Sequence, residues 1–325
     1  MITFIVYLFV FLKNCIYGIS VFFTGKLSNN VDFLDILALR FLLTFVVFYI
    51  LKALKIVKIN IGYKDYIGKT NRSKYMKSLF LAGLFEPVLY MLFETIGITM
   101  TTNITAAVIL SLMPVASCIA ESLILKEHTT FMEKVFFLIG ILGVVYIAVN
   151  TDVSGSKDSV LGIMFIVLAV ITASLFSVYS RKSAKKFTAM ERTYFASFLG
   201  MIVFNSINIV RHLYVGDILS YFNPYFNFDN IIGFVYLSVI STILAAGMNN
   251  YALGKVQAST VSAFSGVSTF VTIMAGIFFG GEVLHTFQVI GITLILIRII
   301  GVSYISIKKN SSGKNKEISE TTCQS

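Results

Sequence analysis

Charged residues are scarce in this sequence. They make up 13% of its 325 residues, about half of the roughly 25% that is usual in soluble domains. A chain of this length with so little charge cannot cover a water-facing surface, so an ordinary soluble fold is excluded. The low charge indicates a protein whose main solvent is lipid.

Residues for metal, disulfide or nucleotide chemistry are also few. The three cysteines, Cys15, Cys118 and Cys323, form no CxxC or Cys/His spacing, and three histidines are too few for a His-rich metal site. The sequence contains no GxxxxGK[ST] loop, which argues against direct use of a nucleotide by this chain. We therefore expect no cofactor, no metal site and no disulfide framework.

What the sequence has instead is long apolar blocks. Hydrophobic residues make up 57% of the chain and the mean hydropathy is +0.85. The blocks are roughly 20 residues long, the length that crosses a bilayer core, and most have no polar face. This pattern predicts an all-α integral membrane protein of about ten transmembrane helices. The expected spans are 3–24, 34–54, 78–98, 103–125, 135–151, 159–180, 193–213, 231–251, 258–280 and 286–307. The first is interpreted as a helix because it lacks the charged start and cleavage site of a signal peptide.

Basic residues alternate between the loops. Segments 52–77, 181–192 and 308–316 are rich in Lys and Arg, whereas the loops expected on the opposite side of the membrane contain only Lys26, Lys157 and Arg211. Cytoplasmic loops of membrane proteins carry such an excess, so we expect a multi-pass protein of the cell membrane with both termini cytoplasmic. Since topology explains the net charge of +10, the expected partner is the lipid bilayer and no nucleic acid is expected.

The chain also contains an internal repeat. Segments 78–151 and 231–307 share a Gly at a reversal, a run of small residues, an apolar stretch ending in Glu127 or Glu282, and a helix ending in Gly-Val-x-Tyr. Five helices per half would invert one half relative to the other, an arrangement found in many transporters. The predicted divisions are repeat 1 at 1–152, repeat 2 at 153–309 and a disordered cytoplasmic tail at 310–325.

Several motifs in this order resemble the EamA-like ten-helix members of the drug/metabolite transporter superfamily. They are LALRFLL with Arg40, TAAVILSLMPV with Pro114, Lys126-Glu127, STILAAGMNNYALGKVQAS, and GGE followed by FQVIGITLI. The resemblance implies two inverted five-helix repeats and transport by alternating access, often export of metabolites or amino acids. Glu86-Pro87 and Arg298 depart from the family pattern, as does Ser268-Thr269 at the place of Pro114 in the second copy.

Charged residues inside the expected spans are the first candidates for function. Charge at a helix centre costs roughly 2.5–3.5 kcal/mol on insertion scales, and Lys13, Glu86 and Arg298 lie nearest the middle of their spans. Glu86 is interpreted either as a substrate or proton-coupling carboxylate or as half of a fixed ion pair with Lys13 or Arg298. Arg40 lies near the end of its span and is interpreted as snorkelling to the interface, with attraction of an anionic substrate as the alternative.

Other residues are candidates for ligand contact or helix shape. Asn249 and Asn250 offer amides to a polar solute or to neighbouring helices. Pro87 and Pro114 are expected to kink their helices, as gating hinges or as ordinary kinks. The small residues Gly276 and Gly280 are expected to allow close helix packing.

Together these features predict a secondary transporter, not an enzyme. Its expected substrate is a small metabolite, such as an amino acid or another small organic solute, with export favoured and protons as a candidate coupling ion. The alternatives are a channel or a membrane-embedded enzyme such as an acyltransferase, the latter suggested by His212 followed five residues later by Asp217. That pair lies at a predicted helix end, away from any other candidate group. The sequence predicts neither the substrate's identity nor the oligomeric state.

Overall fold

The computed structural model describes residues 2–61, 72–125 and 158–281, together with single residues at 135, 139, 142, 146, 286, 289, 290, 293 and 297. Over these residues the protein is all-helical and contains no strand. The elements are α1 (Ile2–Ser28), α2 (Phe33–Ala53), η1 (Ser73–Tyr75), α4 (Met76–Gly83), η2 (Leu84–Leu89), α5 (Tyr90–Thr99), α6 (Asn103–Leu110), α7 (Met113–Leu125), α9 (Val160–Ser183), α10 (Ala189–Val215), η3 (Ile218–Ser220), η4 (Asn223–Phe226), α11 (Phe228–Val235), η5 (Tyr236–Ala245), α12 (Ala246–Leu253), α13 (Ala258–Ala263) and α14 (Ser265–Gly280).

Within these described ranges, seven helical stretches are long and apolar enough to cross a membrane. They are Phe4–Ser28, Phe33–Ala53, Ser73–Thr99, Asn103–Ile124, Val160–Ser183, Ala189–Val215 and Asn230–Leu253, and Ser265–Gly280 is a shorter apolar helix. A helical protein with several apolar spans is therefore confirmed. The expected spans at 135–151 and 286–307 lie outside the described residues apart from single positions, so the count of ten stays a prediction.

Capping residues set the helix ends that the apolar pattern placed only approximately. The stretch expected from residue 193 begins at Ala189 because Thr188 and Glu191 form a capping box. The Thr188 side chain accepts from the Glu191 backbone N–H at 3.3 Å, and the Glu191 carboxylate accepts from the Thr188 N–H at 2.8 Å. Two otherwise unpaired backbone N–H groups are satisfied in this way, which extends the helix past the apolar block.

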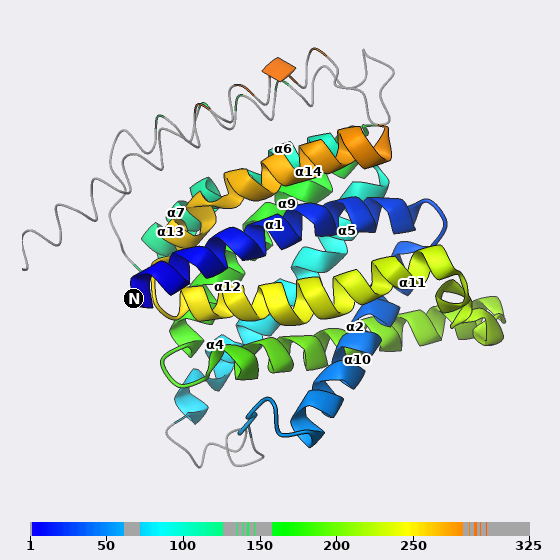
Figure 1. Ribbon diagram of the computed structural model, residues 1–325, viewed down its shortest axis with the longest axis horizontal. Helices are drawn as coiled ribbons and strands as arrows, with labels where there is room; N and C mark the ends of the chain where they lie inside the picture. The colour runs from blue at the N-terminus through cyan, green and yellow to red at the C-terminus, as the bar shows by residue number, and fades with distance from the viewer. Residues whose placement is uncertain are drawn as a thin grey trace, which may run out of the picture.

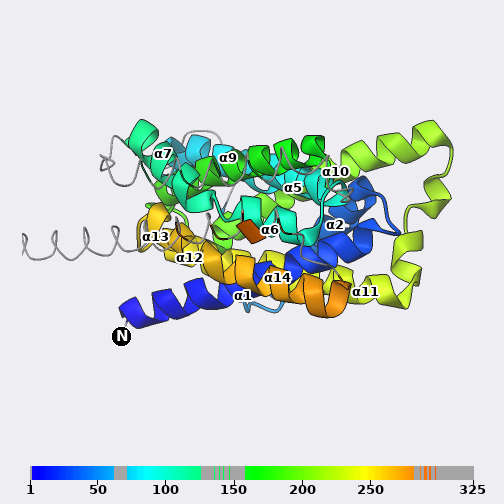
Figure 2. The same ribbon diagram turned by 90° about the horizontal axis from the view of Figure 1, so that it is seen from above.

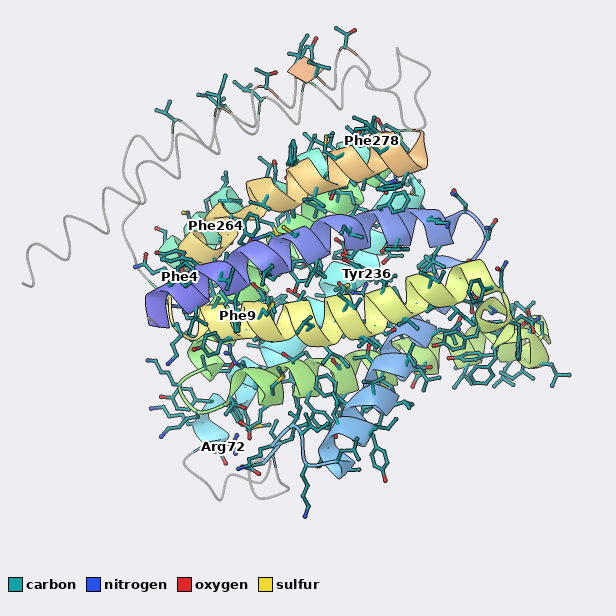
Figure 3. The ribbon with its side chains drawn as sticks, in the orientation of Figure 1. Phe4, Phe9, Arg72, Tyr236, Phe264 and Phe278 are labelled. Carbon is teal, nitrogen blue, oxygen red and sulfur yellow. The ribbon has the colours of Figure 1, made fainter. Side chains whose placement is uncertain are left out.

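Helix α1 lies on one face of the bundle, where it is flanked by α14 and by the continuous stretch of α11, η5 and α12 (Figure 1). Seen from above, α1, α12 and α14 lie on one side of the molecule and α7, α9 and α10 lie on the other (Figure 2). Tyr236 of η5 points toward α1 (Figure 3), where its hydroxyl donates to the Ile16 carbonyl at 3.0 Å. Phe9 packs edge-on against Tyr251 with ring centroids 5.5 Å apart. These contacts hold α1 against the α11–α12 stretch.

Gly18 allows α1 to approach α14 closely. A Cβ atom at Gly18 would lie 2.7 Å from the Ser268 carbonyl oxygen and 2.8 Å from Val271 Cβ, and the Thr272 hydroxyl donates to the Gly18 carbonyl at 2.9 Å. Gly276 is buried on α14 and Gly280 is exposed within the described ranges. The packing role expected of these two glycines stays a prediction.

Four of the spans expected from the sequence are interrupted along their length, those at 78–98, 103–125, 231–251 and 258–280. The stretch from Ser73 to Thr99 breaks at Glu86, whose extended backbone (φ −141°, ψ 118°) precedes Pro87. Helices α6 and α7 are separated at Ser111 and Leu112, with Pro114 in the first turn of α7. The second half has π-helical η5 between α11 and α12, and a break at Phe264 between α13 and α14. The structure thus places both Pro87 and Pro114 at helix interruptions, where proline's missing N–H is tolerated. Their gating role stays a prediction.

Candidate functional site

A cavity lies in the interior of the bundle, between the helices of its two sides. It encloses about 840 Å³ of space outside atoms, including the solvent at its mouth. Residues of α1, α2, η2, α5, α6, α7, α9, η5, α12, α13 and α14 line it. Both helical breaks near prolines reach this cavity, through Glu86 and through Leu110 and Met113. The interruptions and the cavity are therefore parts of one region.

Among the described residues, four acidic or basic side chains line this cavity: Lys13 of α1, Arg40 of α2, Glu86 of η2 and Glu94 of α5. Lys13, Arg40 and Glu94 are only 7%, 3% and 8% exposed. Within the described part of the chain, none of the four forms an ion pair at 4.0 Å or less. Two cationic and two acidic groups thus face the same enclosed space without neutralising one another by direct contact.

Lys13 and Glu86, which the sequence offers as a candidate ion pair, both line this cavity. The Lys13 ammonium lies 5.3 Å from the centre of the Tyr17 ring, a cation–π contact that partly replaces water. Lys13 and Glu86 interact electrostatically, but the structure shows no direct ion pair between these two described residues. Arg298, the other expected partner of Glu86, lies outside the described residues.

Arg40 is buried beside the cavity, so the interpretation that it snorkels to the interface is wrong. Its Nε donates to Thr242 Oγ1 at 3.0 Å and its Nη2 donates to Ser241 Oγ at 3.3 Å. Both hydroxyls belong to π-helical η5. Position along a span does not reveal polar partners on a neighbouring helix, so the sequence alone favours snorkelling.

Glu94 was not among the leading candidates, yet it faces the cavity. Tyr90, also a lining residue, donates its hydroxyl to Glu94 Oε1 at 2.5 Å. One signal was available in the sequence: Glu86, Tyr90 and Glu94 are four residues apart, a spacing that brings side chains to one helix face. Tyr17 lines the cavity as well, and in the described structure its buried hydroxyl has no hydrogen-bond partner.

The two adjacent asparagines have different environments. Asn249 lines the cavity and forms no side-chain hydrogen bond with the residues that the structure describes. Asn250 joins helices instead: its Oδ1 accepts from the Ser180 hydroxyl at 2.7 Å and its Nδ2 donates to Thr193 Oγ1 at 3.0 Å. Arg192 also donates to the Asn250 backbone carbonyl. The geometry therefore leaves the Asn249 amide available to a solute and commits the Asn250 amide to packing.

His212 and Asp217 contact each other. The sequence placed this pair away from other candidate groups, but in the structure His212 also contacts Asp35. The His212 Nδ1 lies 2.8 Å from Asp217 Oδ1, and its Nε2 lies 2.8 Å from Asp35 Oδ1. Asp35 comes from α2, which the spacing along the sequence could not show. Because carboxylates occupy both ring nitrogens, neither nitrogen is free to act as the base of an acyltransferase.

Sequence comparisons place this arrangement in a known group. The profile of the EamA-like transporter family matches residues 4–149 and again residues 160–304. This chain belongs to the EamA-like transporter family. The resemblance read from its motifs is thereby confirmed, and the family indicates a membrane transporter rather than an enzyme.

Relatives with similar sequences are also described as transporters. The uncharacterized transporter YcxC of Bacillus subtilis is 29% identical over 305 residues, covering 94% of both chains. An uncharacterized transporter of Archaeoglobus fulgidus is 27% identical over 246 residues, covering 75% of this chain and 82% of the relative. One crystal structure superposes with a TM-score of 0.61 at 13% identity, covering 92% of this chain and 97% of the other. That likeness extends the shared fold over nearly the whole length.

Proposed function

We propose that this chain is a secondary transporter that carries a small organic solute through the central cavity by alternating access, with export favoured. The proposal rests on one observation: in the described part of the chain, four acidic or basic side chains line a single cavity without direct ion pairs among them. Ionisable groups inside a membrane are expensive and typically mark substrate or ion pathways. Membership of a transporter family supports a role for these side chains in a substrate or ion pathway.

Within this proposal, each cavity residue has a role that follows from its side-chain chemistry. Glu86 serves as the proton-coupling carboxylate or as a ligand for a cationic group, and Lys13 balances it from α1. Asn249 offers an amide to the solute, whereas Asn250 supports the site through its helix-joining bonds. Arg298 stays a candidate. Equal numbers of cationic and acidic groups suit a zwitterionic solute such as an amino acid.

The proposed architecture is two inverted five-helix repeats, at 1–152 and 153–309, followed by a cytoplasmic tail at 310–325. Two observations support it. The family profile matches twice in succession, and the helix interruptions fall at corresponding places, at Glu86 and η5 and then at Ser111 and Phe264. The basic loops support a cell-membrane location with both termini cytoplasmic.

The test is transport by the purified protein in liposomes. Solutes that change in cells with and without the protein are offered to proteoliposomes under an imposed pH gradient. Wild-type protein is expected to accumulate one of them against its gradient. Glu86→Gln removes the ionisable group at nearly constant volume and should abolish accumulation, while Asp32→Asn, an exposed carboxylate outside the cavity, should not.

Two results would contradict this function. Downhill flux without accumulation would identify a channel, and undiminished accumulation by folded Glu86→Gln would remove this carboxylate from coupling.

A further inference from the structure

We propose that Arg40 is the anion-binding group of the cavity, and that it binds a carboxylate or another oxyanion on the transported solute. This inference rests on the proposed function, because it assigns a substrate class to the same cavity. It goes further by requiring that every good substrate carries an anionic group.

The guanidinium of Arg40 is buried without a counter-ion in contact. Arg40 is 3% exposed, and no described carboxylate lies within 4.0 Å of it. Glu94 and Glu86 share the cavity with Arg40, and Glu94 already accepts from Tyr90. A buried cation that lacks a direct partner is costly, so an acceptor from outside the protein is the natural complement.

Neighbouring hydroxyls fix the orientation of the guanidinium. Thr242 donates its own proton to the Leu237 carbonyl at 2.7 Å, so its oxygen presents lone pairs to Arg40 Nε at 3.0 Å. Ser241 accepts from Nη2. These bonds leave Nη1 without a protein acceptor among the described residues. The group is held still while part of its donor set remains available.

Arg192 shows what a structural buried arginine looks like in this protein. It is 4% exposed, but its Nη1 donates to both Ser180 O and Ser180 Oγ, at 2.9 and 2.7 Å, and its Nη2 donates to the Asn250 carbonyl. Both of its terminal nitrogens are therefore used by neighbouring helices. Arg40 differs by leaving Nη1 unused and by lining the cavity.

An oxyanion suits the guanidinium of Arg40 better than other solute groups. The guanidinium is planar, stays charged and offers N–H groups spaced to match carboxylate or phosphate oxygens. A neutral amide of the same shape could accept one hydrogen bond but would not balance the buried charge. Substitution of an acid by its amide therefore isolates the interaction.

The experiment measures thermal stabilisation of the purified full chain by matched acids and amides. The pairs are propionate and propionamide, alanine and alaninamide, leucine and leucinamide, and succinate and succinamide, at constant ionic strength. A bound ligand raises the unfolding temperature according to its concentration and Kd. At least one acid is expected to stabilise wild-type protein while its amide does not.

Variants then assign the effect to Arg40. Arg40→Gln should weaken binding of that acid about 10- to 100-fold. Arg40→Lys should weaken it less, because it keeps the charge but loses the planar fork. The matched control Arg211→Gln removes an arginine that pairs with Asp32 outside the cavity and should bind normally. Thr242→Val keeps the guanidinium but releases Nε, so intermediate weakening is expected and provides a second test if Arg40→Gln does not fold.

Three outcomes would overturn the proposal: amides that stabilise as well as their acids, a panel in which no acid stabilises, or unchanged binding in Arg40→Gln or Thr242→Val. Liposome transport separates this failure from that of the proposed function. Accumulation of only solutes that lack a carboxylate or other anionic group would refute the role of Arg40 and leave the transporter function intact. Binding of the acid without its accumulation would refute the transporter function and leave the anion-binding role of Arg40 intact.

Discussion

The two adjacent asparagines allow solute binding and helix packing to be separated within one pair of variants. Asn249→Ala is expected to weaken solute binding with little loss of stability, because its amide faces the cavity. Asn250→Ala is expected to destabilise the fold with little change in affinity. It removes the acceptor of Ser180 and the donor to Thr193, both in fully buried surroundings.

The size of the Asn250→Ala effect follows from the bonds lost. Interhelical hydrogen bonds in membrane proteins average about 0.6 kcal/mol and reach about 1.7 kcal/mol. Two such bonds, with Ser180 left without its acceptor, give an expected loss of about 1–3 kcal/mol in the free energy of unfolding. Asn249→Ala should change this quantity by less than about 0.5 kcal/mol.

Stability is measured in a Cys15→Ser, Cys323→Ser background with a thiol-reactive dye that reports exposure of Cys118, which is 8% exposed in the folded protein. Affinity is measured by the ligand-dependent rise of the unfolding temperature in the same samples. The reasoning is refuted if Asn250→Ala folds with unchanged stability, or if the two variants lose stability equally.

Two further predictions concern helix packing. Gly18→Ala should destabilise the protein by about 1–3 kcal/mol, because its Cβ would lie 2.7 Å from the Ser268 backbone oxygen. The control Gly247→Ala should destabilise it less, because its Cβ would meet only the flexible end of Met190, at 3.0 Å. Equal unfolding temperatures for the two variants would contradict this prediction. Glu121→Ala should increase amide hydrogen exchange in α13, because the Glu121 carboxylate accepts from the Ala258 N–H at 2.9 Å. Glu121→Gln keeps an acceptor there and should show a smaller increase, and exchange equal to wild type in both variants would exclude this role.

The class of fold could be predicted because helices that cross a lipid bilayer must consist mostly of apolar residues. Blocks of apolar residues reveal spans directly, and the stretches at Phe33–Ala53 and Val160–Ser183 lie within a few residues of their expected positions. Exact ends depend on single capping side chains, such as Thr188 with Glu191. Hydropathy does not record these, so Ala189 as a starting point was not predicted.

Of the candidate site, only the charged residues in the middle of their spans could be predicted from the sequence, because burying charge in a membrane is energetically costly. Lys13 and Glu86 stood out because charge in mid-span has few structural explanations, and both reach the cavity. Asn249 and Asn250 could not be told apart, since neighbouring residues on a helix point about 100° apart and the sequence does not say which direction faces the cavity. Arg40 was misjudged because its partners, Ser241 and Thr242, come from a helix some two hundred residues away in sequence.

In the sequence, Glu86 is a charge inside a span and Pro87 is an expected kink. In the structure, both belong to one helix interruption. Pro87 cannot supply a backbone N–H, and the residue before it takes up an extended backbone where the helix is interrupted. The carboxylate that faces the cavity is therefore attached at the break in its span. A solute or proton that changes the charge of Glu86 acts on the residue where the helical hydrogen bonds are already interrupted. Of the described charged residues on the cavity, Glu86 is the one whose own backbone is non-helical. If the cavity binds the solute as proposed, Glu86 is therefore the residue through which binding would act most directly on a helix.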